Sequence, residues 1–535
     1  MMRRTPLSLS LCLGLALGTA ASLAPASGSA ADGGTITLGR VSDGDRYDPH
    51  RSSALAAAEV LYMVGDTLVT LGYDLQTLHP GLAKSWDLSE DGLTYTFHLR
   101  DDVTYCDGKR FTAKDVVGTM DRWLKPDAPN VSTWKAGSVD SITAADDFTV
   151  VYKLQEPNSA LLYQMAQFNF VMIDPEQAEA LGEDFGVKAF NGTGPYCFES
   201  WQPRESVVLR RHEGYTWGPE FMASQGPAKA ETVIWKIVPE EATLAATITA
   251  GEVDASYAVP SWSLAQFEAD PTTELLRPEA SFRTHYLGMK ITRPNMQDRK
   301  VREAVSLASD QSAIADAIFF GTAEPATAYY SQKALDYNPE IDQSPFGYDP
   351  DKAAALLGEA GWAKGGDGML EKDGQKLTLT LYGFNSSSSR EAAEAVQSDL
   401  RKIGIELAIE LYDNTAIWGK LREQTYDLYQ MDYPYLNAGD ALNLYFLSAN
   451  VPSPNRMMWE DPTTDKLIED GNKATNDAAR HAAYAGAGKV VHDAMLWKPL
   501  VNESLVVVAG ARLKPFQPHG ISGAGFNNGL TLELK

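Results

Sequence analysis

One stretch constrains the fold of this 535-residue chain more than any other, and it runs from Leu78 to Arg122. Apolar and polar residues alternate through Tyr95, Phe97 and Leu99. That period is typical of a β-strand with one buried face. The Asp-Gly pair at 91–92 precedes this strand and is typical of a tight turn. The stretch therefore predicts antiparallel β structure in the first third of the chain.

The end of the same stretch predicts an amphipathic helix. A second Asp-Gly pair at 107–108 closes a short extended segment, and Thr112 follows it with Asp115 three residues later. A Thr side chain can accept an orphan backbone N–H at a helix start, and an acid in the first turn suits the positive helix end. The expected buried face consists of Val116, Val117, Met120 and Trp123.

The segments on either side alternate between strand and helix. Strands are expected over 35–41, 207–211 and 232–238, then a helix over 240–250 and another strand over 253–257. Strand–helix–strand order favours an α/β fold with mixed sheets.

The second half repeats this rhythm. Asp349-Pro350 has the residues preferred at a helix start, and 386–389 reads as a polar loop before the next helix. The expected strands are 282–289, 377–382, 405–411, 426–431 and 499–508, and the expected helices lie around 301–308, 350–360, 391–402, 464–472 and 477–494.

The first residues are typical of an export signal. Arg3 and Arg4 precede an apolar run over 7–24, and small residues around 28–31 fit a cleavage site, so the mature chain is expected to begin near Ala31 or Asp32. Cys12 lies inside the apolar run, which argues against a lipoprotein. No later run has 18 or more apolar residues, so we expect no direct membrane insertion.

Charge and cysteine content limit the function classes. The formal net charge is −25, and loss of a leader with two arginines and no acids makes it −27. Such a surface repels nucleic acid and anionic lipid, so neither is an expected partner. Cys106 and Cys197 remain in the mature chain. Export permits a disulfide, but they lie on separate motifs, and the sequence favours two unpaired, buried cysteines.

The run from Leu82 to Val117 resembles the signature of family 5 extracytoplasmic solute-binding proteins, which serve ABC importers of peptides, nickel chelates, opines and oligosaccharides. Further matches follow in the same order over nearly the whole mature chain. They are Asn191–Tyr196, Thr249–Ala255, Asp298–Ala308, Tyr348–Ala353 with Glu359–Trp362, and Leu400–Ile405.

The resemblance implies a two-lobed periplasmic binding protein fold, type II-like, with mixed sheets and an extra subdomain in the first lobe. The expected lobe I core is 32–70, 191–283 and 497–535, with a subdomain at 71–190, and lobe II is 284–496. Two crossover strands near Arg283–Leu287 and Pro499–Leu505 are expected to act as the hinge between the lobes.

Signals for catalysis and for metals are weak. G-x-S-x-G, H-E-x-x-H and C-x-x-C are absent, and the eight histidines include no pair at i, i+4 spacing. Asp43-x-Asp45 resembles the start of a calcium loop, but Asp48 and Ala54 replace the required Gly and Glu. The glycines at 192–194 and the sequence 486–489 fail the phosphate-loop patterns. We therefore expect no enzyme activity, no metal and no cofactor.

Three stretches are expected to contact a ligand by resemblance. In the family, the loop after the first strand faces the ligand, and ordinary turn chemistry is the competing explanation for these residues here. The other two stretches are Gly383–Ser389 and Tyr429–Asp440. For each candidate Trp and Tyr, core packing is the competing explanation. The candidate residues are Asp45, Tyr47, Asp48, Asn385, Trp418, Asp432, Tyr433, Tyr435 and Asn437, with Tyr62, Trp134 and Trp262 as weaker candidates.

Two positions bear on the solute. Family members that bind dipeptides have an arginine where this chain has Gly383, and peptide binders place a carboxylate where it has Asn437, with Asp432 close by. A buried ammonium without a counter-charge is destabilised by several kcal/mol. The usual contacts to both ends of a dipeptide are therefore missing, and a neutral, hydroxyl-rich or amphipathic ligand is expected, held by stacking faces and amide groups.

The resulting hypothesis is the periplasmic substrate-binding component of an ABC importer. It would capture a small solute, peptide-like, opine-like or an oligosaccharide, and deliver it as a monomer to the transmembrane permease subunits. A periplasmic sensor or chaperone with the same fold is the alternative, and a cleft hydrolase is a third class. The sequence leaves the identity of the solute open.

Overall fold

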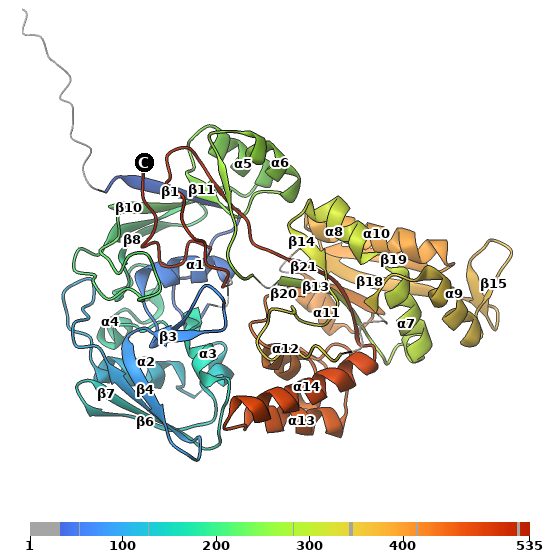
Figure 1. Cartoon of the computed structure of the whole chain (residues 1–535), viewed down its shortest axis with the longest axis horizontal. Helices are drawn as coiled ribbons and strands as arrows, with labels where there is room; N and C mark the ends of the chain where they lie inside the picture. Colours follow the sequence, from blue (N-terminus) through green and yellow to red (C-terminus); the bar gives the residue numbers. More distant parts are fainter. Residues whose placement is uncertain are drawn as a thin grey trace, which may run out of the picture.

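The computed structural model describes residues 33–52, 54–126, 128–281, 283–341, 346–413, 416–521 and 525–535. The expected export signal at 1–31 lies outside these residues. The chain forms two lobes, as Figure 1 shows, with the N-terminal half mainly in one and the C-terminal half mainly in the other. Each lobe is built on its own mixed sheet with its own core, which agrees with the expected α/β class.

The first lobe is built on a seven-stranded sheet in the order β12-β22-β11-β1-β10-β9-β8. Its central strand β1 (Thr35–Arg40) runs parallel to β10 (Thr232–Ile237) and buries Ile36 and Leu38. The other elements are α1 (Leu55–Val64), β8 (Tyr196–Gln202), β9 (Ser206–Arg211), α5 (Glu241–Thr249), β11 (Ala255–Ser256), η4 (Ser261–Ser263), α6 (Leu264–Ala269), β12 (Glu274–Leu276) and β22 (Val507–Ala509).

The subdomain contains a four-stranded antiparallel sheet in the order β4-β5-β7-β6. In β5 (Thr94–Leu99), Tyr95, Phe97 and Leu99 face the core as the alternation predicts. The remaining elements are β2 (Val69–Leu71), β3 (Leu78–Pro80), β4 (Ala83–Leu88), α2 (Ala113–Trp123), η1 (Thr133–Ala136), β6 (Val139–Asp146), β7 (Thr149–Leu154), α3 (Leu161–Met165), η2 (Phe168–Phe170), α4 (Pro175–Leu181) and η3 (Gly182–Asp184).

The predicted start of α2 is confirmed in detail. The backbone N–H of Thr112 donates to Asp115 Oδ2 over 2.8 Å, and the Thr112 side chain accepts from the Asp115 backbone. This capping box satisfies two donors that a helix start leaves unpaired. Val116, Met120 and Trp123 are buried as expected, whereas Val117 is half-buried.

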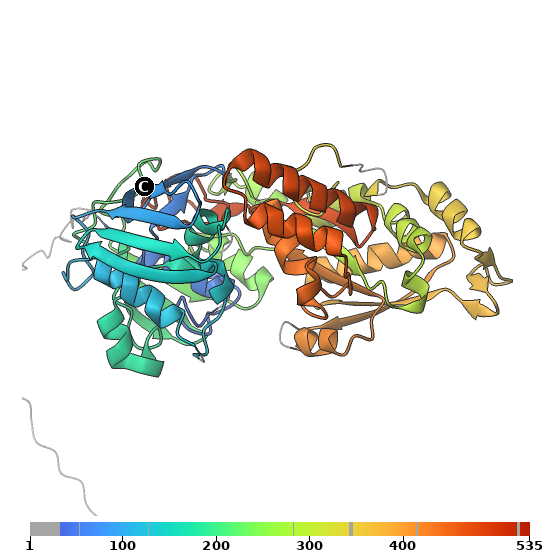
Figure 2. The same cartoon turned by 90° about the horizontal axis from the view of Figure 1, so that it is seen from below.

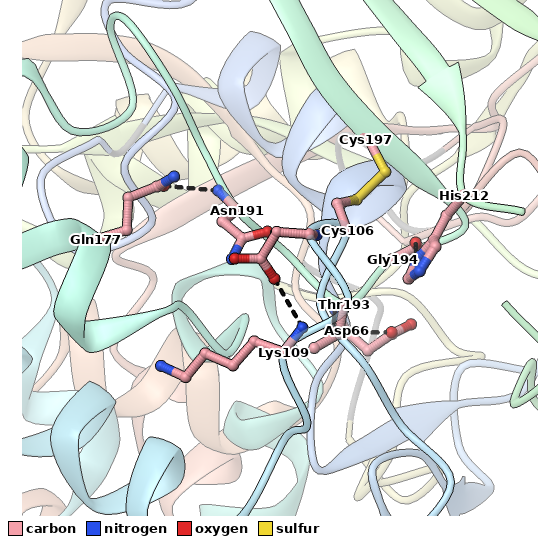
Figure 3. Close-up of a disulfide and its surroundings, with 10 residues drawn as sticks. Asp66, Cys106, Lys109, Gln177, Asn191, Thr193, Gly194, Cys197 and His212 are labelled. Atoms are coloured by element: carbon pink, nitrogen blue, oxygen red, sulfur yellow. Dashed lines mark hydrogen bonds between the residues drawn. A yellow bond between two sulfur atoms is a disulfide. The ribbon is translucent and has the colours of Figure 1, made fainter. Parts of the chain in front are cut away.

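A disulfide joins the subdomain to the lobe I sheet, and the expectation of two unpaired cysteines is therefore wrong. Cys106 follows β5 of the subdomain, and Cys197 lies on β8 (Figure 3). Their Cα atoms are 5.8 Å apart. The backbone N–H of Cys106 also donates to the Gly192 carbonyl over 3.0 Å. The sequence separation of 91 between the two cysteines hid this contact, because folding of the whole subdomain brings them together.

The second lobe is built on a six-stranded sheet in the order β14-β21-β13-β20-β18-β19. Its strands are β13 (Arg283–Met289), β14 (Ala323–Pro325), β18 (Thr378–Phe384), β19 (Glu406–Tyr412), β20 (Leu428–Tyr433) and β21 (Trp497–Glu503), with β15 (Ala363–Lys364), β16 (Leu370–Lys372) and β17 (Gln375–Lys376) in a small separate sheet. The helices are α7 (Arg299–Ala308), α8 (Gln311–Phe319), α9 (Pro350–Glu359), α10 (Ser387–Lys402), α11 (Ala416–Arg422), α12 (Ala438–Tyr445), α13 (Pro462–Asn472) and α14 (Asp477–Asp493), with short turns η5 (Pro294–Met296) and η7 (Ser448–Asn450).

The structure shifts one boundary of the expected domain division. The run over 499–508 reads as one strand in the sequence but forms two, β21 in the lobe II sheet and β22 in the lobe I sheet. The hinge expected near Arg283–Leu287 and Pro499–Leu505 falls mostly on β13 and β21, which are paired along most of their length. The chain passes between the sheets in the shorter segments 277–281 and 504–506.

The lobes also meet away from these connections. The Ser159 backbone N–H and hydroxyl donate to the carbonyls of Asn472 and Gly471 over 2.9 and 2.8 Å. Gln164 Nε2 donates to Asp440 Oδ1 over 2.8 Å. Both views place α12, α13 and α14 beside the subdomain (Figures 1 and 2). The two lobes are therefore joined both by the connecting segments and by this second contact.

Among the described residues, no helix combines the length and the apolar character needed to cross a membrane.

Candidate ligand-binding site

A cavity of about 410 Å³ lies between the two lobes and is lined by both. This volume falls within the range of small-molecule sites. The first lobe contributes the end of β1, one end of α1 and the segment 257–264. The second lobe contributes β13, the end of α8, the start of α10, the end of β20 and the end of β21.

Charged groups from three adjacent strands line the lobe II side. Arg283 Nε lies 3.3 Å from Asp432 Oδ1, and Arg283 Nη1 lies 4.0 Å from Glu503 Oε2. His285 Nε2 is 2.8 Å from the same Glu503 oxygen. Because β13 lies between β20 and β21, these groups cluster at one end of the sheet.

The Arg283 guanidinium stays accessible in this cluster, since 42% of the side chain is exposed. The charge of Asp432 raises the pKa of Arg283 further above its ordinary value. Burial opposes ionisation of Glu503, but the hydrogen bond and charge of His285, with Arg283, hold its pKa below the ordinary value. The Arg283 guanidinium therefore lies between two acidic side chains, Asp432 and Glu503.

The lobe I side carries a second, more buried pair. Arg40 Nη1 lies 3.1 Å from Glu59 Oε2, and the Tyr257 hydroxyl donates to the other Glu59 oxygen. Arg40 also donates to the Tyr47 hydroxyl over 2.6 Å and to Asp43 over 2.9 Å. Burial raises the pKa of Glu59 to about 7, although the charge of Arg40 opposes this. Ionised Glu59 at the cavity wall thus depends on its arginine partner.

Four consecutive serines line the cavity from lobe II. The sequence reads 386–389 as a loop, but the helix α10 begins at Ser387, and Ser386 is its N-cap. The Ser386 side chain accepts the Ser389 N–H over 3.4 Å. Ser is a preferred cap because its hydroxyl competes for backbone groups at a helix end. The N-terminal turn of a 16-residue helix, the positive end of its dipole, therefore lines the site.

The first predicted stretch has structural roles. Tyr47 is fully buried between Arg40 and Asp43, and Asp48 is buried in an ion pair with Arg122 at 2.5 Å. Asp45 is exposed and accepts from the Ser52 hydroxyl. None of the three is among the described residues that line the cavity. The partners of Tyr47 and Asp48 explain the burial of these two side chains without a ligand.

The predicted aromatic residues also lie outside the cavity lining. Tyr435 is fully buried and packs against Tyr433 at a centroid distance of 4.8 Å and against Trp497. Trp418 is 41% exposed on α11, where the Arg456 guanidinium lies 5.4 Å from its ring. Core and surface packing account for these side chains.

The two predicted asparagines differ in role. Asn437 is the N-cap of α12 and accepts the Asp440 N–H over 2.8 Å. Asn385 is exposed, directly precedes the lining serines and accepts from Arg390. Of the nine candidates, Asp432 lines the cavity.

Of the weaker candidates, Trp262 lines the cavity, Tyr62 borders a small separate cavity of about 40 Å³, and Trp134 is exposed on η1.

Four residues of the lining are not among the sequence candidates, namely Arg283, Glu59, Tyr257 and Glu503. The position of Arg283 at the start of the strand after the crossover offered one signal, because a residue at a crossover faces both lobes. Nothing in the local pattern around Glu59 distinguishes it from other helix residues.

A possible metal cluster is excluded by the disulfide. Among the described residues, Cys106, Cys197 and His212 bring potential ligand atoms within 4.8 Å of one another. The two sulfurs are bonded to each other, and His212 Nδ1 lies 3.0 Å from the Gly194 carbonyl (Figure 3). Two of the three groups therefore have no thiolate to offer a metal.

The model for bacterial extracellular solute-binding proteins, family 5, matches residues 77–453. The chain belongs to this family. As a family 5 protein it is a solute-binding component of an ABC importer and not an enzyme.

Curated relatives and solved structures agree with the family assignment. The chain is 28% identical over 528 residues to the glutathione-binding protein GsiB of Salmonella paratyphi A, covering 96% of this chain and 97% of that one. NikA from Brucella suis, in complex with Fe(III)-EDTA, is 25% identical with a TM-score of 0.81, and the match covers 94% and 100% of the two chains. DppA from Helicobacter pylori, in complex with the peptide STSA, is 24% identical with a TM-score of 0.78, covering 94% and 98%.

Proposed function

We propose that this family 5 protein captures a small zwitterionic, peptide-like solute in the interlobe cavity. The observation that carries the proposal is that accessible groups of both signs, from two lobes, border one cavity. A ligand bridging the lobes binds the closed arrangement better than an open one, so differential affinity favours closure.

The charges support a zwitterion over the neutral ligand favoured by the sequence. The cation that dipeptide binders place at the position of Gly383 would be supplied here by Arg283. The carboxylate that peptide binders place at the position of Asn437 would be supplied by Asp432 or Glu503. A ligand carboxylate would pair with Arg283 and the start of α10, and a ligand amine with one of the two carboxylates. Each opposite charge removes the cost of burying its partner unpaired.

The names of the relatives point in the same direction. GsiB proteins are glutathione-binding proteins, and DppA from Helicobacter pylori holds a peptide. Glutathione and short peptides carry both an amine and a carboxylate. They are therefore the first solutes to test with this chain.

We also propose the cellular setting. The family is extracellular, and the first 31 residues read as an export signal, which supports the periplasm as the compartment. The transmembrane permease subunits of the importer are the proposed protein partners, reached by the closed form as a monomer. The segments 277–281 and 504–506, which connect the two sheets, are the proposed hinge, with lobe I, its subdomain and lobe II as the moving bodies.

Thermal unfolding with a solute panel tests the proposal. Reduced glutathione, dialanine and a neutral trisaccharide are added separately to the mature protein. A ligand at a hundredfold excess over its Kd adds about 2.7 kcal/mol to stability. We expect glutathione or dialanine to raise the melting temperature and the sugar to leave it unchanged.

Matched variants link any shift to the cavity. Arg283→Met should weaken binding at least about thirtyfold, since truncating one partner of a charge pair costs about 2 kcal/mol or more. Arg401→Met, a substitution of an exposed arginine on α10 outside the cavity lining and outside the proposed hinge, is the control. Binding of the neutral sugar alone, or equal affinity for both variants, would contradict the proposal.

A further inference from the structure

Three large apolar side chains at the cavity are exposed to an unusual degree. Trp262 is 53% exposed, Phe320 is 51% exposed and Leu55 is 40% exposed, and all three line the same interlobe cavity. Folded proteins rarely gather large exposed apolar groups without a binding role. The charged cluster at Arg283 and Asp432 borders the same cavity, so the wall has a polar part and an apolar part.

The apolar part is built from both lobes. Trp262 lies on η4 of lobe I, Phe320 directly follows α8 of lobe II, and η4 packs against α8. Leu55 begins α1 of lobe I. An apolar group placed among them is contacted by both lobes and becomes exposed to water when the lobes separate.

The backbone at Phe320 gives independent support. Phe320 ends α8 in the left-handed conformation, with φ 48° and ψ 42°. This conformation is costly for any residue with a Cβ, and glycine is the usual choice at a helix end. Gly321, with φ 81°, is the very next residue. The chain thus holds an exposed aromatic ring in a strained position, and strain of this kind concentrates at functional sites.

We propose that Trp262 and Phe320 form an aromatic clamp for an apolar, preferably aromatic, side group of the solute. This inference rests on the proposed function and narrows it from peptide-like zwitterions in general to those with an apolar substituent. The charged ends bind at Arg283 and the carboxylates, and the substituent lies between the two rings. Aromatic pairs favour such contacts beyond the area that they bury.

Matched ligand pairs test the clamp. Calorimetric titration compares dialanine with alanyl-phenylalanine, and glutathione with S-benzylglutathione. Within at least one pair we expect the aromatic member to bind at least tenfold more tightly. Trp262→Ala and Phe320→Ala should reduce that ratio to below about threefold while the non-aromatic member keeps its affinity.

Controls separate a local effect from misfolding. Trp134 is also 53% exposed but lies outside the cavity lining, so Trp134→Ala should keep the full preference. Phe320→Gly removes the ring and the backbone strain together, so it should keep or raise the melting temperature and still lose the preference.

The outcomes distinguish the two proposals. If both members of each pair bind equally to the native protein, or if the preference survives in Trp262→Ala and Phe320→Ala, the clamp is refuted while zwitterion binding stands. If no member of either pair binds, zwitterion binding is refuted and the clamp with it.

Discussion

Removal of the Cys106–Cys197 bond should destabilise the first lobe and leave the second almost unchanged. The perturbation is the double substitution Cys106→Ser with Cys197→Ser in the mature protein. The bond closes a loop across 91 residues, and the chain-entropy relation gives about 4.6 kcal/mol at 25 °C for a loop of that length. The bond spans the subdomain and the lobe I sheet, so the cost falls on that unit.

This free energy predicts a measurable shift in calorimetry. Lobe I with its subdomain, taken as 33–281 and 504–535, contains about 280 residues. The entropy of such a unit rises by about 600 cal/mol/K on unfolding at its midpoint. The first transition should therefore fall by about 8 °C. The lobe II transition is an internal control, because its sheet and core contain neither cysteine.

Two results would refute this reasoning. The mature protein without substitutions, once unfolded in guanidinium, should not react with a thiol reagent. Two reactive thiols would show that the bond is absent. A first transition that moves by less than about 2 °C, or a lobe II transition that moves equally, would show that the loop constraint does not set the stability of lobe I.

Three further predictions concern single side chains. Burial lowers the pKa of Lys135 to about 8, against the opposing charge of Asp440. Between about pH 8 and the ordinary lysine pKa near 10.5, the unfolded chain therefore binds more protons than the folded one, and stability should rise with pH by up to about 3 kcal/mol in total. Thermal melts from pH 7 to 9.5 should show this rise in the wild-type protein and not in Lys135→Met. Equal pH profiles for the two proteins would contradict the prediction. Asn437→Ala should lower the free energy of unfolding by about 1 kcal/mol in denaturant titration, because it removes the α12 cap, whereas Asn437→Asp should leave it unchanged. A change in solute affinity with unchanged stability would instead indicate that Asn437 contacts the ligand. Phe320→Gly should raise stability by up to about 1 kcal/mol in the same titration, since glycine relieves the left-handed strain, and a loss of stability would show that the ring is held by packing.

Local sequence signals predicted the elements well. The capping box at Thr112 and Asp115, the alternation through Tyr95 and Leu99, and the helix start at Asp349 all depend on residues within a few positions of one another. Such signals act through backbone hydrogen bonds and side-chain direction, which the neighbouring residues determine. They specify what an element is, but not which other element it meets.

The cavity depends on pairings that no local signal contains. Tyr257 and Glu59 are 198 residues apart, and His285 and Glu503 are 218 apart. Tyr47 and Asp48 show the reverse error, since the sequence suggested that the loop after β1 is accessible. Arg40 donates to the Tyr47 hydroxyl, Arg122 pairs with Asp48, and both side chains are buried. Resemblance pointed to the loop of Asp432, which lines the cavity, but for the cation it pointed to Gly383 and not to Arg283. A binding site between two lobes is defined by the closed arrangement, so its residues become recognisable when both lobes are present together.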